Sequence, residues 1–542
     1  MNDLRRQPVG IDIDSPSTSS PDRSAERILR LFGFTYSNGE DLRAAEEKTL
    51  SMIRKCLDVG STSSDADIAG LVSSFRDTEI PSGTLDLDSY LDQIADKVVP
   101  HSVRTSSPRF IGHMTSALPS FFMPLQSLIT AMNQNLVKME TSKVLTLSER
   151  QTLAMIHRLV YDFDPAFYAQ HAHDTRSTLG IMTSGGTISN ITALWCARNS
   201  SLKPCDGFLG VEAEGLHAGL AYYGYKGAVI IGSRLMHYSF DKAAGVLGLG
   251  TKELIKLPTN IRGELDVTAL RDAIAASRRE GKRIIALIGV AGVTDSGSID
   301  PLMEIAEIAA EEKIHFHVDA AWGGPVLLSS KHRRKLEGIA CADTVTIDGH
   351  KQLYLPMGVG ITLFKDPGMA RAIEKVANYI IRANSRDLGK RSLEGSRPDR
   401  ATLLHASLHI IGRRGYEYLI DEGIRKALYM ADRIRRRPEF ELIYEPQVNI
   451  LNYRYLPEPF RMKVRQGEIG AAENREINAV NEQLQKSQRK AGANFVSRTV
   501  LDCTKYDVPI VALRAVIANP LTKESDIDAV LEEQLRIASP IR

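Results

Sequence analysis

Short, continuously apolar segments alternate with amphipathic segments through the middle of the chain. Strands that are buried on both faces of a parallel sheet have this pattern. The segments between them carry helix signals: Asp266 precedes apolar residues at helical spacing, and Gly281 follows the last of them. Asp300 and Pro301 are typical of another helix start, with proline at the first helical position. The expected strands lie at 179–183, 228–231, 284–290, 314–318, 344–347 and 360–364.

The alternation predicts an α/β fold with a mostly parallel central sheet, and the flanking regions differ from it. The N-terminal residues are rich in Ser, Asp, Pro and Arg, which is typical of disorder. The C-terminal part favours long helices at about 407–437 and 472–491, strands at 495–501 and 510–517, and a last helix at 524–537. The expected divisions are a disordered tail (1–25), a helical segment (26–125), a large domain (126–405) and a small α/β domain (406–542).

Composition and charge exclude several classes of protein. The chain is 43% hydrophobic and 25% charged, with a net charge of +2, so no global field favours nucleic acid. The longest apolar run, 284–293, is too short to span a bilayer, and no signal peptide is visible. These features favour a cytoplasmic protein, as do the five cysteines, which are scattered singly at positions 56, 196, 205, 341 and 503.

A glycine-rich stretch joins the first expected strand to a helix. Gly185, Gly186 and Thr187 lie where backbone N–H groups at a helix start can bind an anion. The stretch is neither GxGxxG nor a P-loop, so it favours a single phosphate over a dinucleotide or ATP. A plain tight turn remains the alternative.

Asp319 and Lys351 each end an expected strand, at the edge where α/β sheets bind ligands. A carboxylate can pair with a ring nitrogen, and a lysine can form a Schiff base with an aldehyde, so together they favour pyridoxal 5'-phosphate (PLP). His237 follows an earlier strand and could stack on a pyridine ring. A rival hypothesis is zinc or iron, because His315, His317 and Asp319 alternate along one strand.

The stretch 317–366, which contains HVDAAWGGP and IDGHKQLYLPMG, resembles the group II PLP-dependent amino-acid decarboxylases. It is most similar to the bacterial pyridoxal-dependent aspartate 1-decarboxylase subgroup, and 481–499 resembles that subgroup as well. The resemblance implies PLP fold type I (aspartate-aminotransferase-like), a homodimer with a swapped N-terminal segment, and conversion of L-aspartate to β-alanine and CO2, which would serve pantothenate biosynthesis.

The resemblance also implies roles for residues at matching positions. Lys351 would bond to PLP, Asp319 would pair with its ring nitrogen, and His237 and Ala321 would contact its two faces. The glycine stretch and Thr294 would lie at the cofactor, with His350 touching cofactor or substrate. The substrate would be bound by Arg397, at its α-carboxylate, and by Asn133 and Asn135. Arg104, Arg109, Gln134 and Arg400 are further candidates for reading the substrate side chain.

Two departures from the family pattern leave alternatives open. Many members have Asn-Pro-His-Lys where this chain has Asp348-Gly349-His350-Lys351. Members often carry a loop tyrosine that protonates the substrate carbon, yet 382–394 contains none, and Tyr379 lies early. His350 is then a candidate proton donor. The alternatives are decarboxylation of glutamate, cysteine sulfinate or tyrosine, a PLP-dependent carbon–carbon lyase, and a PLP-binding protein without turnover.

Overall fold

The computed structural model describes residues 28, 31–32, 39–57, 60–64, 66–376, 384–506 and 508–540. The tail expected to be disordered, 1–25, lies outside these residues. The chain divides into two compact units. The first comprises Met1–Cys56 and Val72–Pro100, and the second comprises Leu57–Leu71 and His101–Arg542.

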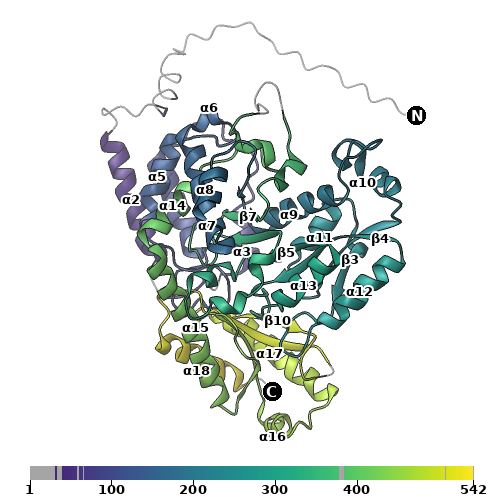
Figure 1. Cartoon of the computed structure of the whole chain (residues 1–542). Coiled ribbons are helices and arrows are strands. Elements are labelled where there is room, and N and C mark those ends of the chain that lie inside the picture. Colours follow the sequence, from purple (N-terminus) through teal and green to yellow (C-terminus); the bar gives the residue numbers. More distant parts are fainter. Residues whose placement is uncertain are drawn as a thin grey trace, which may run out of the picture. The chain divides into compact units, whose positions relative to one another are not determined.

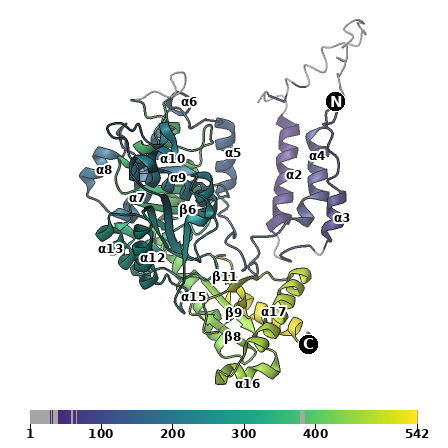
Figure 2. The ribbon, with the colours of Figure 1, turned by 90° about the vertical axis from the view of Figure 1, so that its right-hand side faces the viewer.

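Among the described residues of the first unit, α2 (Gly39–Leu57) and α4 (Leu87–Lys97) lie side by side (Figure 2). The Lys48 ammonium of α2 lies 2.6 Å from the Asp88 carboxylate of α4. Such an exposed pair adds at most about 1 kcal/mol, so it positions the helices without accounting for their stability. No residue of α4 is buried, and the Tyr90 side chain is 53% exposed.

The second unit is built around a seven-stranded sheet with the order β1-β7-β6-β5-β4-β2-β3 (Figure 1). β7 runs antiparallel to β1 and β6, and the other neighbouring pairs are parallel, so the expected mostly parallel sheet is confirmed. The short edge strand β3 was not predicted, because four residues with a central lysine resemble a loop. The strands are β1 (Gly180–Thr183), β2 (Gly227–Ser233), β3 (Leu254–Leu257), β4 (Lys282–Val290), β5 (His315–Asp319), β6 (Thr344–Asp348) and β7 (Gly360–Phe364).

Helices precede and connect these strands. Asp266 caps α12 as predicted, by accepting the backbone N–H groups of Thr268 and Ala269. Asp300 does not cap α13: Pro301 occupies the cap position, and the buried Asp300 carboxyl accepts backbone N–H groups of Leu265 and Val290. The helices are α3 (Ile68–Ser73), α5 (Phe122–Met132), α6 (Met139–Ser142), α7 (Val144–Tyr161), α8 (Pro165–His171), α9 (Gly186–Ser201), α10 (Val211–Tyr222), α11 (Ser239–Val246), α12 (Val267–Arg279) and α13 (Leu302–Glu312).

Both faces of the large sheet are covered by helices. In β2, Val229 and Ile231 belong to an apolar cluster with α7, α12 and α13, whereas Ala228 and Ile230 belong to a cluster with α9 and α11. Successive side chains of a strand point to opposite faces, so a strand buried on both faces must be apolar throughout. This is the physical reason for the uninterrupted apolar segments of the sequence.

The C-terminal part forms a smaller α/β layer around a four-stranded antiparallel sheet with the order β10-β11-β9-β8. The single helix expected at 407–437 is two helices, which part at Gly412, where φ is +68°. Strands β8 and β9 were not predicted. The elements are α14 (Ala401–Ile410), α15 (Gly412–Arg435), β8 (Phe440–Tyr444), β9 (Ile450–Tyr455), α16 (Glu458–Gln466), α17 (Ala471–Ala491), β10 (Ser497–Leu501), β11 (Ile510–Val516) and α18 (Glu524–Ala538).

The apolar core of this layer packs α15, α17 and α18 against the sheet. The layer matters for function because β11 reaches the edge of the large sheet: the Arg514 guanidinium donates to the Thr294 carbonyl at 2.6 Å. In the described part of the chain, no helix has the length and apolar character needed to cross a bilayer.

Candidate active site

A cavity of about 580 Å³ opens at the carboxyl ends of the parallel strands. Val290, Asp319 and Asp348 each end a strand there, since parallel strands bring their carboxyl ends to one edge of the sheet. The glycine stretch after β1 forms one wall. His113 and Arg514 complete the cavity from outside the large sheet.

The glycine stretch leads directly into α9. Gly185 has a φ of +151°, in the region that favours glycine. A Cβ on Gly186 would lie 2.8 Å from an oxygen of Asp348, so a side chain does not fit there. No side chain caps the start of α9, and its first N–H groups face the cavity edge formed by Thr187. This local structure suits a phosphate group.

Asp319 is nearly buried and is held by two donors. Its Oδ1 accepts the Ala321 backbone N–H at 3.1 Å, and its Oδ2 accepts the Asn190 amide at 2.9 Å. Both donors fix the orientation of the carboxylate toward the cavity, which Ala321 and Asn190 also line. A carboxylate held in this way can accept a further hydrogen bond from a protonated ring nitrogen.

Lys351 lies one turn beyond β6. Its ammonium is 3.0 Å from Asp348 Oδ2, and the other Asp348 oxygen is buried without a hydrogen-bond partner among the described residues. His350 Nδ1 is 2.8 Å from the Val359 carbonyl, so it donates there and turns its Nε2 away from Val359. The lysine amine therefore reaches the same cavity as Asp319 and the glycine stretch.

His237 and Thr294 line the cavity as well. His237 Nδ1 accepts the Ser239 backbone N–H at 3.2 Å, which leaves the ring proton on Nε2. Burial lowers the pKa of His237, partly offset by Asp319, so the ring is favoured in its neutral, stackable form. The structure thus brings together Gly185, Gly186, Thr187, His237, Thr294, Asp319, Ala321, His350 and Lys351.

Arg514 was missed in the sequence. Its guanidinium is 8% exposed, donates to the carbonyls of Thr294 and Gly112, and forms no ion pair with any described carboxylate. Burial lowers the pKa of Arg514, which is the cost of holding a cation there. A signal did exist: β11 reads IVALRAV, and a lone arginine in a buried strand needs a partner or a ligand.

His113 is the second missed residue. It lines the cavity, and burial together with the positive charges of Arg514 and Lys351 lowers its pKa. Its sequence context, Ser-Ser-Pro-Arg-Phe-Ile-Gly-His, has no periodicity that points to a site. Backbone hydrogen bonds of Ile111 with Phe495 and Val516, together with the Arg514 bond to Gly112, bring this segment beside the small sheet.

Arg397, Asn133 and Asn135 do not line the cavity of their own chain, contrary to expectation. The Arg397 guanidinium is bound by both oxygens of Glu149, at 2.7 Å and 2.5 Å, and the pair is buried. Asn135 accepts the Arg397 backbone N–H and so supports this buried pair, whereas Asn133 ends α5. None of the four further candidates, Arg104, Arg109, Gln134 and Arg400, lines the cavity either.

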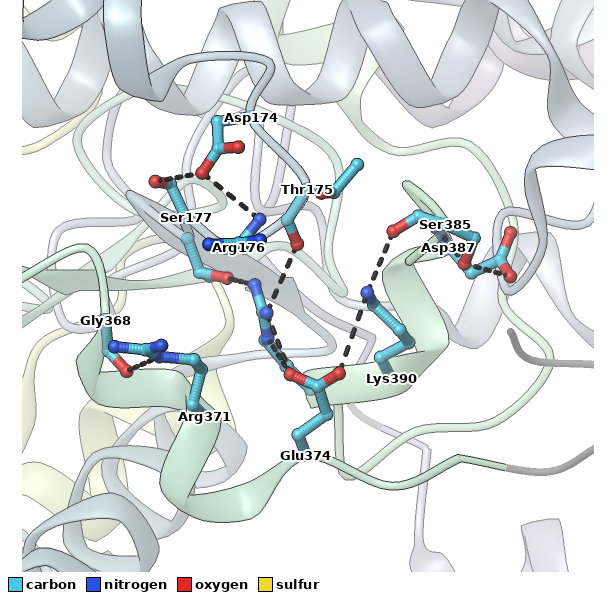
Figure 3. Close-up of polar contacts among 12 residues, drawn as sticks. Asp174, Thr175, Arg176, Ser177, Gly368, Arg371, Glu374, Ser385, Asp387 and Lys390 are labelled. Carbon is cyan, nitrogen blue, oxygen red and sulfur yellow. Dashed lines mark hydrogen bonds and ion pairs between the residues drawn. The ribbon is translucent and has the colours of Figure 1, made fainter. Parts of the chain in front are cut away.

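Tyr379 and the first two residues of the stretch 382–394 lie outside the described residues, whereas 384–394 are described. Figure 3 shows that Glu374 and Lys390 meet across the base of this stretch; their charged atoms are 3.7 Å apart. Arg391 donates to the same Glu374 carboxylate at 2.8 Å. In the described part of this stretch no tyrosine is present, and the two basic residues are held by Glu374.

The alternation of His315, His317 and Asp319 does not create a metal centre in the described residues, where no cluster of three ligating side chains occurs. The His317 ring is bound instead by Thr344 and Asn190. The zinc or iron hypothesis therefore has no geometric support among these residues.

Comparisons with known proteins agree with this geometry. The family described as "Pyridoxal-dependent decarboxylase conserved domain" matches residues 72–456. An aspartate 1-decarboxylase from Aliivibrio fischeri is 42% identical over 96% of this chain and 95% of its own length. An L-2,4-diaminobutyrate decarboxylase from Rhizobium meliloti is 28% identical over 82% of this chain and 83% of its own.

Solved structures show the same fold. The crystal structure of mouse CSAD has a TM-score of 0.80 and 24% identity, covering 92% of this chain and 99% of its own. The structure of Oryza sativa TDC with PLP and tryptamine has a TM-score of 0.79 and 19% identity, covering 94% and 99%.

The fold and the cavity define a PLP enzyme of fold type I: a mostly parallel sheet places the glycine stretch, the buried Asp319 and Lys351 in one cavity. The chain belongs to the pyridoxal-dependent decarboxylase family, and its activity is PLP-dependent decarboxylation of an amino acid. The predicted fold class, cofactor and enzyme class are confirmed.

Proposed function

We propose that the substrate is L-aspartate, which loses its α-carboxyl group as CO2 to give β-alanine. The observation that carries this proposal is the 42% identity, over 96% of the chain, to an aspartate 1-decarboxylase. The cavity supports an acidic substrate, because Arg514 adds positive charge to it and the neutral His113 ring can donate a hydrogen bond. β-Alanine formed in this way would serve pantothenate biosynthesis. The five unpaired cysteines favour a cytoplasmic location for the enzyme.

The residues of the cavity fit PLP. Gly185, Gly186 and Thr187 would bind its phosphate at the start of α9. Asp319 would pair with its ring nitrogen and Lys351 would hold it covalently, with His237 and Ala321 at its two faces and Thr294 nearby. When bound, PLP supplies an electron-withdrawing ring that accepts the electron pair left by the departing CO2.

The chain's own residues bind the substrate and handle its proton. Arg514 binds one carboxylate of the substrate with Nη2 in a charge-assisted contact, because its Nε and Nη1 already donate to other groups and no described carboxylate pairs with it. His113 lies beside Arg514 and reads the second carboxylate. His350 keeps its Nδ1 proton on the Val359 carbonyl and, as a doubly protonated ring, delivers the Nε2 proton to Cα, in place of the tyrosine that is missing from 384–394.

A homodimer is part of this proposal. The first unit exposes several large apolar side chains within residues 72–90, and we infer that together they form an apolar surface that marks an interface. In the homodimer that the family resemblance implies, the N-terminal segment of one chain covers the partner chain. The residues are Val72, Phe75, Ile80, Leu85, Leu87 and Tyr90, each at least half exposed.

The substrate is tested by CO2 release from aspartate, glutamate, cysteine sulfinate, tyrosine and 2,4-diaminobutyrate under identical conditions. We expect aspartate to have the highest kcat/KM, with β-alanine as the product. A higher kcat/KM for another amino acid would identify that amino acid, and not aspartate, as the substrate. CO2 release from none of them, with PLP bound, would favour a binding protein without turnover.

The covalent role of Lys351 is tested separately with Lys351→Ala. We expect this variant to lose the visible absorbance of covalently bound PLP and to lose turnover by a factor on the order of a thousand or more. Lys331→Ala, which removes a lysine that is 72% exposed, is the control and should behave as the wild type. Unchanged absorbance in Lys351→Ala would contradict the role.

A further inference from the structure

A line of hydrogen bonds runs from Asp319 through the large sheet to its opposite edge. Asn190 Nδ2 lies 2.9 Å from Asp319 Oδ2, and Asn190 Oδ1 lies 3.1 Å from His317 Nε2. His317 Nδ1 lies 2.8 Å from Thr344 Oγ1, which also lies 2.8 Å from His315 Nε2. Asn190, His317 and Thr344 are at most 1% exposed, so water does not compete for these bonds.

The donors and acceptors along this line have a single consistent assignment. A carboxylate only accepts, so Asn190 must turn its amide nitrogen toward Asp319, and its oxygen must accept from His317 Nε2. Burial lowers the pKa of His317 to about 3, so its ring is neutral and carries one proton, on Nε2. Its Nδ1 then accepts the hydroxyl proton of Thr344, and Thr344 accepts from His315.

Every proton of the line therefore points toward Asp319. The second N–H of Asn190 donates to Ser239 Oγ at 3.0 Å, which fixes the same amide orientation. Hydrogen bonds that polarise one another in one direction strengthen each other in a buried site. The last donor of the line thus holds the Asp319 carboxylate more firmly than an isolated amide would.

The outer end of the line is reachable from solvent. His315 lines a second cavity, of about 650 Å³, at the amino ends of the strands. Its Nδ1 lies 3.9 Å from the Asp343 carboxylate, and its Nε2 faces inward to Thr344. The line thus begins at this second cavity and ends in the active site.

We propose that Asn190, His317 and Thr344, with His315 at the outer end, are positioning residues that orient Asp319 as the acceptor for the ring nitrogen of PLP. This inference rests on the proposed role of Asp319. The residues touch neither cofactor nor substrate except through Asp319, apart from Asn190 at the cavity wall. The line gives hydrogen-bond partners to the buried side chains of His317 and Thr344, which otherwise would only cost desolvation.

The test is the PLP dissociation constant of Thr344→Val, measured by titrating the apoenzyme and following the visible absorbance. Valine has nearly the shape of threonine but removes both hydrogen bonds of the hydroxyl group. We therefore expect PLP binding to weaken about two- to tenfold. Thr344→Ser restores the hydroxyl and should restore affinity. The matched control is Thr346→Val, in the same strand and equally buried, whose hydroxyl has no hydrogen-bond partner among the described residues.

Repeating the substitution in a variant that lacks the Asp319 carboxylate distinguishes a positioning role from a merely structural effect. In Asp319→Asn, which should itself weaken PLP binding, adding Thr344→Val should cause no further loss. The same loss in both backgrounds, or wild-type affinity in Thr344→Val alone, would overturn the inference. Wild-type affinity in Asp319→Asn would instead overturn the proposed role of Asp319.

The wild-type enzyme provides an independent check should Thr344→Val not fold. In protein with ¹⁵N-labelled histidine, the spectrum should contain a neutral ring protonated on Nε2 that disappears in His317→Gln. A His317 ring that is protonated on Nδ1, or on both nitrogens, at neutral pH would overturn the inference.

Discussion

The buried charge of Arg514 is the feature at the residue scale with the largest consequence. Taking a guanidinium out of water costs several kcal/mol. The charge of Asp295 offsets this cost only in part, because no described carboxylate forms an ion pair with Arg514. The cost is recovered when an anionic substrate binds. Arg397, expected in this role, is instead paired with Glu149, which occupies its guanidinium.

We expect Arg514→Met to raise KM for aspartate about ten- to a hundredfold, because a charge-assisted hydrogen bond is worth about 1.5 to 3 kcal/mol. Steady-state kinetics and the PLP dissociation constant measure the effect, and PLP affinity should change little. Arg498→Met, on the neighbouring strand β10 and 36% exposed, is the control. An unchanged KM in Arg514→Met would remove Arg514 from the substrate site.

His157 shows how one buried side chain makes stability depend on pH. Its Nε2 donates to the Phe364 carbonyl at 3.0 Å, its Nδ1 lies 3.1 Å from the Tyr168 hydroxyl, and burial lowers its pKa to about 4. The folded pKa lies below the usual 6.5, so the folded state resists protonation. Stability is therefore complete above about pH 6.5 and is lost as the pH falls toward 4.

We expect the free energy of unfolding to fall by about 2 kcal/mol through His157 between pH 6.5 and pH 5. Urea unfolding at both pH values measures this loss. His157→Gln should be less stable at pH 7 but should lose less on acidification, because glutamine does not titrate. An equal loss in wild type and variant would assign the pH dependence to other groups, such as the buried His317.

At the scale of elements, the junction between β1 and α9 decides whether phosphate can bind. The helix start must approach Asp348 and Gly360 so closely that glycine is required on both sides: a Cβ on Gly360 would lie 2.5 Å from the Gly185 backbone. This close approach brings the free N–H groups of α9 to the edge of the sheet where β5 ends at Asp319 and where Lys351 follows β6.

We expect Gly186→Ala to weaken PLP binding at least about tenfold, because its methyl group would displace Asp348 and narrow the phosphate site. The dissociation constant of PLP and the melting temperature of the apoenzyme measure binding and folding separately. Gly245→Ala in α11, where a Cβ meets nothing within 4 Å, is the matched control and should bind PLP normally. Equal affinity in both variants would contradict a phosphate site at Gly186.

At the scale of the whole molecule, the two units differ in how they bury apolar surface. The second unit has continuous apolar cores on both faces of its large sheet, whereas α4 of the first unit buries none of its residues. An exposed apolar surface on a helix with a polar opposite face is typical of a segment that is covered by another chain.

We expect light scattering of the wild type to give the mass of a dimer, twice 59.8 kDa. The double substitution Phe75→Glu and Tyr90→Glu should shift this equilibrium toward the monomer, because charges would then be buried at the interface. Leu209→Glu is the control, since Leu209 is 76% exposed in the second unit. A dimer that is unaffected by the double substitution would place the interface elsewhere.

The sequence predicted most of the architecture, and the errors share a cause. The six strands buried on both faces have a distinctive apolar pattern and were all found. The missed strands β3, β8 and β9 carry polar residues that resemble loops until the pairing partners are known. The break at Gly412 and the cap of α13 depend on single backbone angles, which periodicity does not encode.

By itself the sequence determined the strand–helix alternation, the family, and the residues that end strands of one parallel sheet, because these follow from local periodicity and from order along the chain. Only the tertiary structure decided that Arg514 and His113 enter the cavity while Arg397 is held by Glu149, and that Asn190, His317 and Thr344 form one line behind Asp319. Arg397 and Glu149 are 248 positions apart, and Asn190 and His317 are 127 apart. His317 and Thr344 are 27 apart and meet because β5 pairs with β6. Their placement depends on how two sheets and their helices pack, which local pattern does not specify.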